Sequence, residues 1–244
     1  MDSKVVNNEI KKKIFPFLKE SGFTEFNSRN ALRITDQQVD IINFQSFNSY
    51  LAFGVGCTTY SFAINYYVYY KCYEKTPWFN GKVPSKPSEY MWMEQCRIRK
   101  TLNQAKLFHP YGRYDGKDRD DTWYVKEDGS NLDEVIENAK DNIINGGFNY
   151  FERKSNLSEV INEYEKEARE RGMFWIAADR ISTLALELGD IDKAIKALEL
   201  TQKQYLENYK HTLELRKKYK NKFDDPTPYE QAEERIKLLK ILNL

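Results

Sequence analysis

Cysteine and histidine are scarce in this chain of 244 residues. It has three cysteines, Cys57, Cys72 and Cys96, and two histidines, His109 and His211. Three cysteines this far apart do not make a disulfide framework, and without a Cys-x-x-Cys pair they do not make a zinc motif. Neither histidine lies in a nucleophile pattern with a serine, cysteine or carboxylate. We therefore expect reduced, buried thiols, no metal, no cofactor and no catalytic residue.

Long hydrophobic runs and an excess of one charge are also absent. The most apolar stretch, residues 61–70, is too short and too rich in tyrosine to span a bilayer, and no signal-peptide core follows the amino-terminal lysines. With 38 basic and 37 acidic residues, the chain lacks the positive field by which proteins bind nucleic acid or anionic membranes. The sequence predicts a cytoplasmic protein with no membrane contact, and it disfavours nucleic acid as a partner.

The signature motifs of nucleotide, phosphate and metal enzymes are missing as well. There is no G-x-G-x-x-G, no P-loop, no H-E-x-x-H and no nucleophile elbow. A loop carries Asp115, Asp118, Asp120 and Asp121, but their spacing is not that of an EF-hand, so we interpret it as a solvated loop. The absences favour a protein that is not an enzyme.

Aromatic residues, by contrast, are abundant and unevenly distributed. The first 150 residues hold 26 of them and the remaining 94 hold nine. Aromatic and β-branched side chains suit a pleated sheet, whereas the Ala, Leu, Glu and Lys that dominate after about residue 157 suit helices. We expect a chain with a mixed first part and a helical second part.

Period-two alternation identifies the strands of the first part. It is clearest in residues 60–72, where every even position is apolar or aromatic, so one face of this strand should be buried. An amphipathic helix precedes the strands, kinks or ends its regular part at Pro16, and stops at Gly22. The other predicted strands are residues 23–27 and 31–35 as a hairpin, 39–47, 90–99, and a short one at 123–126. Such strands form an antiparallel meander.

Helix signals dominate from residue 130. N-cap residues Ser130, Asn156, Asp190 and Thr227 each precede an apolar stripe of helical period, and the first of these helices should end at Gly146-Gly147. We therefore predict an α+β fold, in which residues 1–155 form an antiparallel sheet covered by helices. Residues 156–244 form an all-helical extension packed on this domain.

The order of five short segments resembles a known family. They are Phe17–Phe23 (FLKESGF), Ile41–Ser46 (IINFQS), the alternating aromatic strand, Cys96–Arg99 (CRIR) and Trp123. Over about residues 4–155 the chain is similar to the domain-of-unknown-function family 4304 (DUF4304). That family often has histidine where this chain has Arg97, so no metal or acid–base role is carried over to this position. The family has no established activity, and the resemblance implies a fold and not a function.

A weaker resemblance covers residues 174–207. Leu188–Glu199 (LGDIDKAIKALE) is similar to the turn and second helix of a tetratricopeptide repeat. A solenoid needs about three repeats to bury its own core, and only one is visible. An ordinary antiparallel helix hairpin is therefore the favoured alternative.

Two arginines suggest a binding site on the sheet. Arg97 and Arg99 are two residues apart, so both should lie on one face of a strand. If Asn43 and Gln45 of a neighbouring strand share that face, the patch could bind a carboxylate or phosphate, with Trp123 at its rim. Alternatively, the two arginines pair with acidic residues or face water.

Two hypotheses for function follow. The first is a non-enzymatic module that binds a protein partner, for example an immunity-type antitoxin. The second is a binder of small anionic ligands, or an enzyme acting on them, that uses the polar sheet face around Arg97 and Arg99.

Overall fold

The chain divides into two compact units in its computed structural model. The structure describes all residues except 80–82, 85–89, 91–92, 105–117, 220–225 and 243–244. The sheet unit comprises Met1–Lys71 and Pro84–Glu152, and the helical unit comprises Cys72–Val83 and Arg153–Leu244. The segment Cys72–Val83 thus belongs with the helical unit, although it lies far from residue 153 in the sequence.

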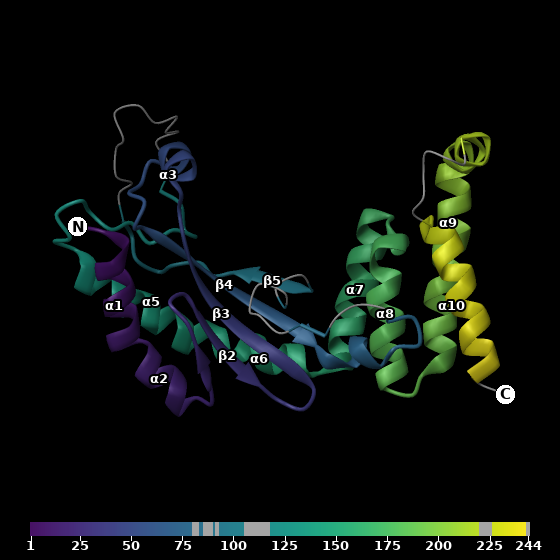
Figure 1. Cartoon of the computed structure of the whole chain (residues 1–244), viewed down its shortest axis with the longest axis horizontal. Helices are drawn as coiled ribbons and strands as arrows, with labels where there is room; N and C mark the ends of the chain where they lie inside the picture. The colour runs from purple at the N-terminus through teal and green to yellow at the C-terminus, as the bar shows by residue number, and fades with distance from the viewer. Residues whose placement is uncertain (80–82, 85–89, 91–92, 105–117, 220–225, 243–244) are drawn as a thin grey trace. The chain divides into compact units, whose positions relative to one another are not determined.

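The sheet unit is built on a five-stranded antiparallel meander, which confirms the predicted α+β fold (Figure 1). Each strand pairs with the next along the chain, from β1 to β5. The strands are β1 Glu25–Phe26, β2 Asn30–Ile34, β3 Gln38–Ser46, β4 Phe62–Tyr70 and β5 Glu94–Arg97. The last predicted strand, residues 123–126, is wrong, because Trp123 makes only an isolated bridge to Phe62.

Helices cover one face of this sheet, which we call the inner face (Figure 1). They are α1 Ser3–Lys13, α2 Phe15–Glu20, α5 Leu132–Asn142 and α6 Phe148–Ser155. Aromatic rings join the helices to the strands: the Phe15 and Phe44 centroids lie 6.3 Å apart, and those of Tyr66 and Phe151 lie 5.1 Å apart. The even-numbered positions of β3 and β4 supply the strand side of this core.

Two helix ends differ from the prediction. The first helix breaks at Ile14, and Pro16 lies in the first turn of α2, where its missing N–H costs no hydrogen bond. The glycines at 146 and 147 do not end a helix, because a π-helical turn, Ile143–Gly147, continues directly into α6. A Cβ at Gly147 would lie 2.2 Å from the Tyr66 hydroxyl oxygen, so glycine is needed here for close packing.

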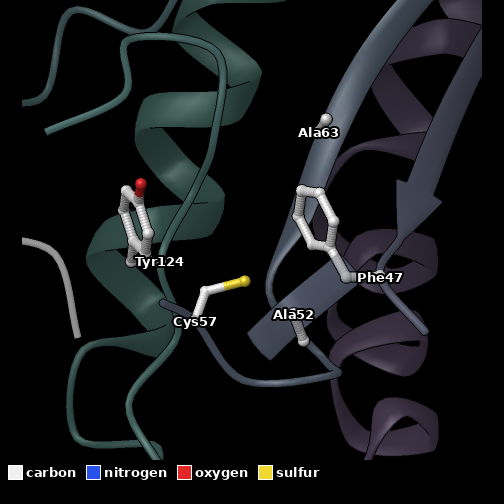
Figure 2. Close-up of a cluster of buried hydrophobic side chains, with 5 residues drawn as sticks. All are labelled: Phe47, Ala52, Cys57, Ala63 and Tyr124. Atoms are coloured by element: carbon white, nitrogen blue, oxygen red, sulfur yellow. The ribbon is translucent and has the colours of Figure 1, made fainter. Parts of the chain in front are cut away.

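The opposite, outer face of the sheet is covered at one end by helix α3, Ser49–Val55, which the sequence analysis missed. Cys57 and Tyr124 pack there with Ala63 of β4 in a buried cluster that also holds Phe47 and Ala52 (Figure 2). Strand β4 is therefore buried at all nine positions, and the prediction of a single buried face is corrected. Among the described residues no disulfide joins the three cysteines, and Cys57 and Cys72 are buried while Cys96 is only half-buried.

The helical unit contains η1 Lys71–Lys75 in part, and α7 Leu157–Arg171, α8 Phe174–Glu187, α9 Ile191–Lys218 and α10 Pro228–Leu242. Three of the four predicted caps are present: Asn156 and Asp190 each accept a backbone hydrogen bond, and Thr227 and Glu230 bond reciprocally in a capping box. The predicted cap at Ser130 is wrong, because α5 begins after Asn131, whose side chain makes no capping hydrogen bond. No helix in the described part of the chain is both long and apolar enough to cross a membrane.

Candidate binding surface on the outer face of the sheet

A row of amide side chains crosses the outer face and ends at Arg97. The strand register places Asn30, Asn43, Asn65 and Arg97 directly opposite one another on β2, β3, β4 and β5. Opposed residues of paired strands point to the same face, so the four side chains form one line. We call the three asparagines and the neighbouring Gln45 the amide row. Asn65, on strand β4 between β3 and β5, is fully buried.

The amide row holds the Arg97 guanidinium in one orientation. Its Nε donates to Asn65 Oδ1 at 3.0 Å, and its second terminal nitrogen donates to Gln45 Oε1 at 2.8 Å. Gln45 lies two strands away, across Ala63, whose small side chain leaves room for arginine to reach it. Two neutral acceptors on the sheet thus position a charge that they do not neutralise.

Further hydrogen bonds align the row itself. Asn65 Nδ2 donates to Gln45 Oε1 at 3.0 Å and to Asn43 Oδ1 at 3.3 Å, and Asn43 Nδ2 donates to Asn30 Oδ1 at 2.6 Å. Asn43 and Asn65 therefore each use the oxygen toward β5 and the nitrogen toward β2. Because buried amides need partners on both ends, this chain of bonds stabilises one side-chain arrangement.

The charge on Arg97 is balanced from outside the sheet by Asp121. The first terminal nitrogen of Arg97 donates to Asp121 Oδ2 at 3.3 Å. Arg119 binds the same carboxylate through two nitrogens, at 2.9 Å to Oδ1 and 2.8 Å to Oδ2. Hydrogen bonds from Arg119, and then from Arg97, hold the pKa of Asp121 well below its ordinary value. Two guanidinium groups thus share one carboxylate.

Two other aspartates of the same loop each form an ion pair with one basic side chain. Asp118 lies 2.7 Å from Lys100 Nζ, and Asp120 pairs with Arg99. Burial lowers the pKa of Lys100, because its side chain is almost entirely removed from water. Asp121 is half-buried, so the interpretation of this loop as solvated is wrong at that residue, while Asp115 lies outside the described residues.

The structure brings together three of the five residues proposed for the site. Asn43, Gln45 and Arg97 share the outer face, as described above. Arg99 is 78% exposed and is held by Asp120 instead. Trp123 lies on the inner face, fully buried, with its ring stacked on Phe62 at 5.9 Å and its Nε1 donating to Asn138.

The sequence analysis missed Asn65 and Asp121, which complete the site. Asn65 was visible as a polar odd position in the alternating strand, but its contact with Arg97 depends on the register of β4 and β5. Asp121 follows the end of β5 by 24 residues, and no local pattern links the two. Contacts over such separations cannot be deduced from periodicity alone.

The arrangement is suited to binding rather than to proton transfer. Within the residues that the structure describes, no three histidine, cysteine or acidic side chains come together as a metal site. His211 is exposed on α9, and His109 lies outside the described residues. What the outer face offers is a guanidinium in a fixed orientation, which binds carboxylate and phosphate groups through paired hydrogen bonds.

The fold and site define an α+β domain with an antiparallel meander, helices on one face and a polar row on the other. The model of the domain of unknown function (DUF4304) matches residues 14–153, more than half of the chain. The chain therefore belongs to the DUF4304 family. Comparison with curated proteins gave no match, and neither did comparison with solved structures.

Proposed function

We propose that this protein is a non-enzymatic binding module, and that its outer sheet face recognises an acidic group of a protein partner at Arg97. The observation that carries the proposal is the orientation of Arg97 by Asn65 and Gln45, two amides on the sheet. A guanidinium that is positioned before binding loses less side-chain entropy when it binds.

Exposure and charge around the amide row support this proposal. The Arg97 side chain is 32% exposed, so a ligand can reach it. Among its described contacts, the guanidinium uses three of its five N–H donors. The exposed Arg119 side chain adds a second positive charge beside Arg97, whereas Arg99 is paired with Asp120. An acidic protein surface, such as that of a toxin neutralised by an antitoxin, would complement it.

Co-purification from the native host tests the proposal. We expect the wild-type chain to retain a stoichiometric partner and Arg97→Gln to lose it, because glutamine keeps much of the stem but not the charge. Arg99→Gln is the matched control, since it removes one exposed arginine of the same strand end. Recovery of no stoichiometric partner, or equal recovery by all three chains, would contradict the proposal.

A small anionic ligand is the second candidate function. The oriented guanidinium of Arg97 favours this function too, because an arginine can bind a small carboxylate or phosphate as well as an acidic group of a protein. Thermal-shift measurements against small carboxylates and phosphates test it. We expect any stabilising anion to lose its effect in Arg97→Gln and to keep it in Arg99→Gln; an unchanged shift in Arg97→Gln would exclude the site.

A further inference from the structure

We infer that the group recognised at Arg97 is a carboxylate, and that Asp121 occupies its place in the free protein as an internal substitute. This inference rests on the proposed function, because it names the ligand class and the regulation of the same site. It follows from the hydrogen bonds that hold the Arg97 guanidinium, which we call the fork, from the contacts of Asp121, and from the charges nearby.

Asp121 binds as an external carboxylate would. Its Oδ2 accepts from Arg97 at 3.3 Å and from Arg119 at 2.8 Å, and its Oδ1 accepts from Arg119 at 2.9 Å. The carboxylate thus bridges two guanidinium groups with both of its oxygens. Arg119 makes the paired contact by which arginines recognise planar carboxylates, and Arg97 adds a single bond.

The position of Arg97 does not depend on Asp121. Asn65 and Gln45 hold two of the three guanidinium nitrogens, and both amides belong to the central strands of the sheet. If the aspartate turned away, these hydrogen bonds would keep the fork in place. A second carboxylate could then bind Arg97 and Arg119 without rearrangement of the sheet.

Asp121 can leave without movement of the backbone beside it. The next two residues are fully buried, and Trp123 exchanges backbone hydrogen bonds with Phe62 at 2.9 and 3.2 Å. The main chain is therefore fixed at this point, whereas the Asp121 side chain retains its own torsions. Apart from the two arginines, its hydrogen bond among the described residues is with the adjacent Thr122 hydroxyl. Release requires a change of rotamer and not local unfolding.

The surrounding charges favour a carboxylate over a phosphate. Asp118 and Asp120 are neighbours of the site, and Asp121 would remain close after displacement. A carboxylate replaces the charge of Asp121 one for one, whereas a phosphate brings close to two negative charges at neutral pH. Asp118 and Asp120 are already paired with Lys100 and Arg99. The two positive charges of Arg97 and Arg119 balance Asp121 and one further negative charge, so the second charge of a phosphate would have no positive partner.

Self-occupancy lowers the apparent affinity of the site. A ligand binds only the fraction of molecules in which Asp121 has turned away, so the observed dissociation constant is the intrinsic one divided by that fraction. If about one molecule in ten is open, removal of the Asp121 carboxylate should tighten binding about tenfold. Neutralisation of Asp120, which pairs with Arg99, should leave the affinity unchanged.

The experiment measures binding to the full-length chain by NMR of the arginine Nε–Hε groups. The probes are succinate for a free carboxylate, N-acetyl-aspartate amide for a carboxylate on a peptide, and inorganic phosphate. The variants are Asp121→Asn, Asp121→Ser, whose shorter side chain cannot reach Arg97, and the matched control Asp120→Asn. We expect about tenfold tighter binding of a carboxylate probe in both Asp121 variants, no change in Asp120→Asn, and weaker binding of phosphate.

The outcomes separate this inference from the proposed function. If no probe shifts the Arg97 signal in any chain, the site itself is refuted. If carboxylates bind the wild type and the Asp121 variants equally, the site stands and self-occupancy is wrong. Tighter binding of phosphate than of succinate would overturn the ligand class. Should both variants fail to fold, the Asp121 carboxylate carbon signal of the wild type must still move on saturation with succinate, and a static signal would refute displacement.

Discussion

Two arginine–aspartate pairs lie on opposite faces of the same sheet and differ in the burial and in the pKa of the aspartate. On the inner face, Arg33 donates to Asp40 at 2.9 and 2.8 Å, and Asp40 is 1% exposed. On the outer face, Arg97 donates to Asp121 at 3.3 Å, and both groups retain contact with water. Because side chains alternate between the two faces along a strand, Arg33 and Asp40 point to the inner face and Arg97 points to the outer face.

The aspartate pKa values move in opposite directions. Burial raises the pKa of Asp40, although Arg33 and Gln38 both favour its charged form. Bonds from two arginines lower the pKa of Asp121, and they outweigh its partial burial. The inner pair is also enclosed by aromatic rings, with the Arg33 guanidinium 5.3 Å from Phe23 and 5.7 Å from Phe151. The comparison indicates that the inner pair is structural and that the outer pair is exchangeable.

The largest expected effect comes from breaking the inner pair. Asp40→Asn removes the buried charge that compensates the half-buried Arg33, and we expect it to lower the free energy of unfolding by about 3 kcal/mol. Chemical denaturation at neutral pH measures this change. Replacing the pair together, as Arg33→Met with Asp40→Leu, should recover much of the loss, because two apolar side chains leave no uncompensated charge. A double variant as unstable as Asp40→Asn would contradict this explanation.

A smaller loss of stability is expected from a substitution in the π-helical turn that packs on the inner face. In Gly147→Ala the new Cβ would overlap the Tyr66 hydroxyl, which is buried and has no hydrogen-bond partner among the described residues. We expect Gly147→Ala alone to lower the free energy of unfolding by about 2 kcal/mol. Tyr66→Phe alone should be nearly neutral, since it removes an unsatisfied polar atom.

The double variant Gly147→Ala with Tyr66→Phe sharpens this prediction. Removal of the hydroxyl should relieve part of the overlap, but the ring carbon that bears it would still lie 2.7 Å from the Cβ. The cost of Gly147→Ala should therefore be smaller by about 1 kcal/mol in the phenylalanine background. Equal costs in the two backgrounds would show that the clash is not with Tyr66.

The smallest expected change in stability comes from Asp121 of the outer pair, and it depends on pH. Because the folded-state pKa of Asp121 lies below its unfolded value of about 3.9, its ionised form stabilises the fold above that pH. This stabilisation disappears as the pH falls toward the folded-state pKa. We expect Asp121→Asn to lose about 1 kcal/mol at pH 7 and the gap from wild type to narrow below pH 4.

Denaturant unfolding of the two chains between pH 7 and pH 3 measures this gap. Asp40 contributes with the opposite sign, since its raised pKa makes protonation favour the folded state, but it is common to both chains and cancels in their difference. Asp120→Asn is the control and should change stability by less than about 0.5 kcal/mol, because its exposed pair with Arg99 is screened by water. A gap that stays constant with pH would contradict the role assigned to Asp121.

Much of the fold was predictable because its signals are local. Alternation in β4 and the N-caps Asn156 of α7 and Thr227 of α10 each depend on residues a few positions apart. The site was predictable only in part, for the same reason. Arg97 was identified by its spacing from Arg99, yet the binding partners of the two arginines are different aspartates.

The sequence by itself determined an α+β protein with an antiparallel sheet, the starts of α7, α9 and α10, and a set of polar residues on alternating strands. Only the tertiary structure decided that Asn65 completes the amide row, that Trp123 turns to the inner face, and that Asp121 pairs with Arg97. The reason is physical: periodicity determines which face a side chain takes within its own strand, but the register between strands and the return of a distant loop decide which side chains meet.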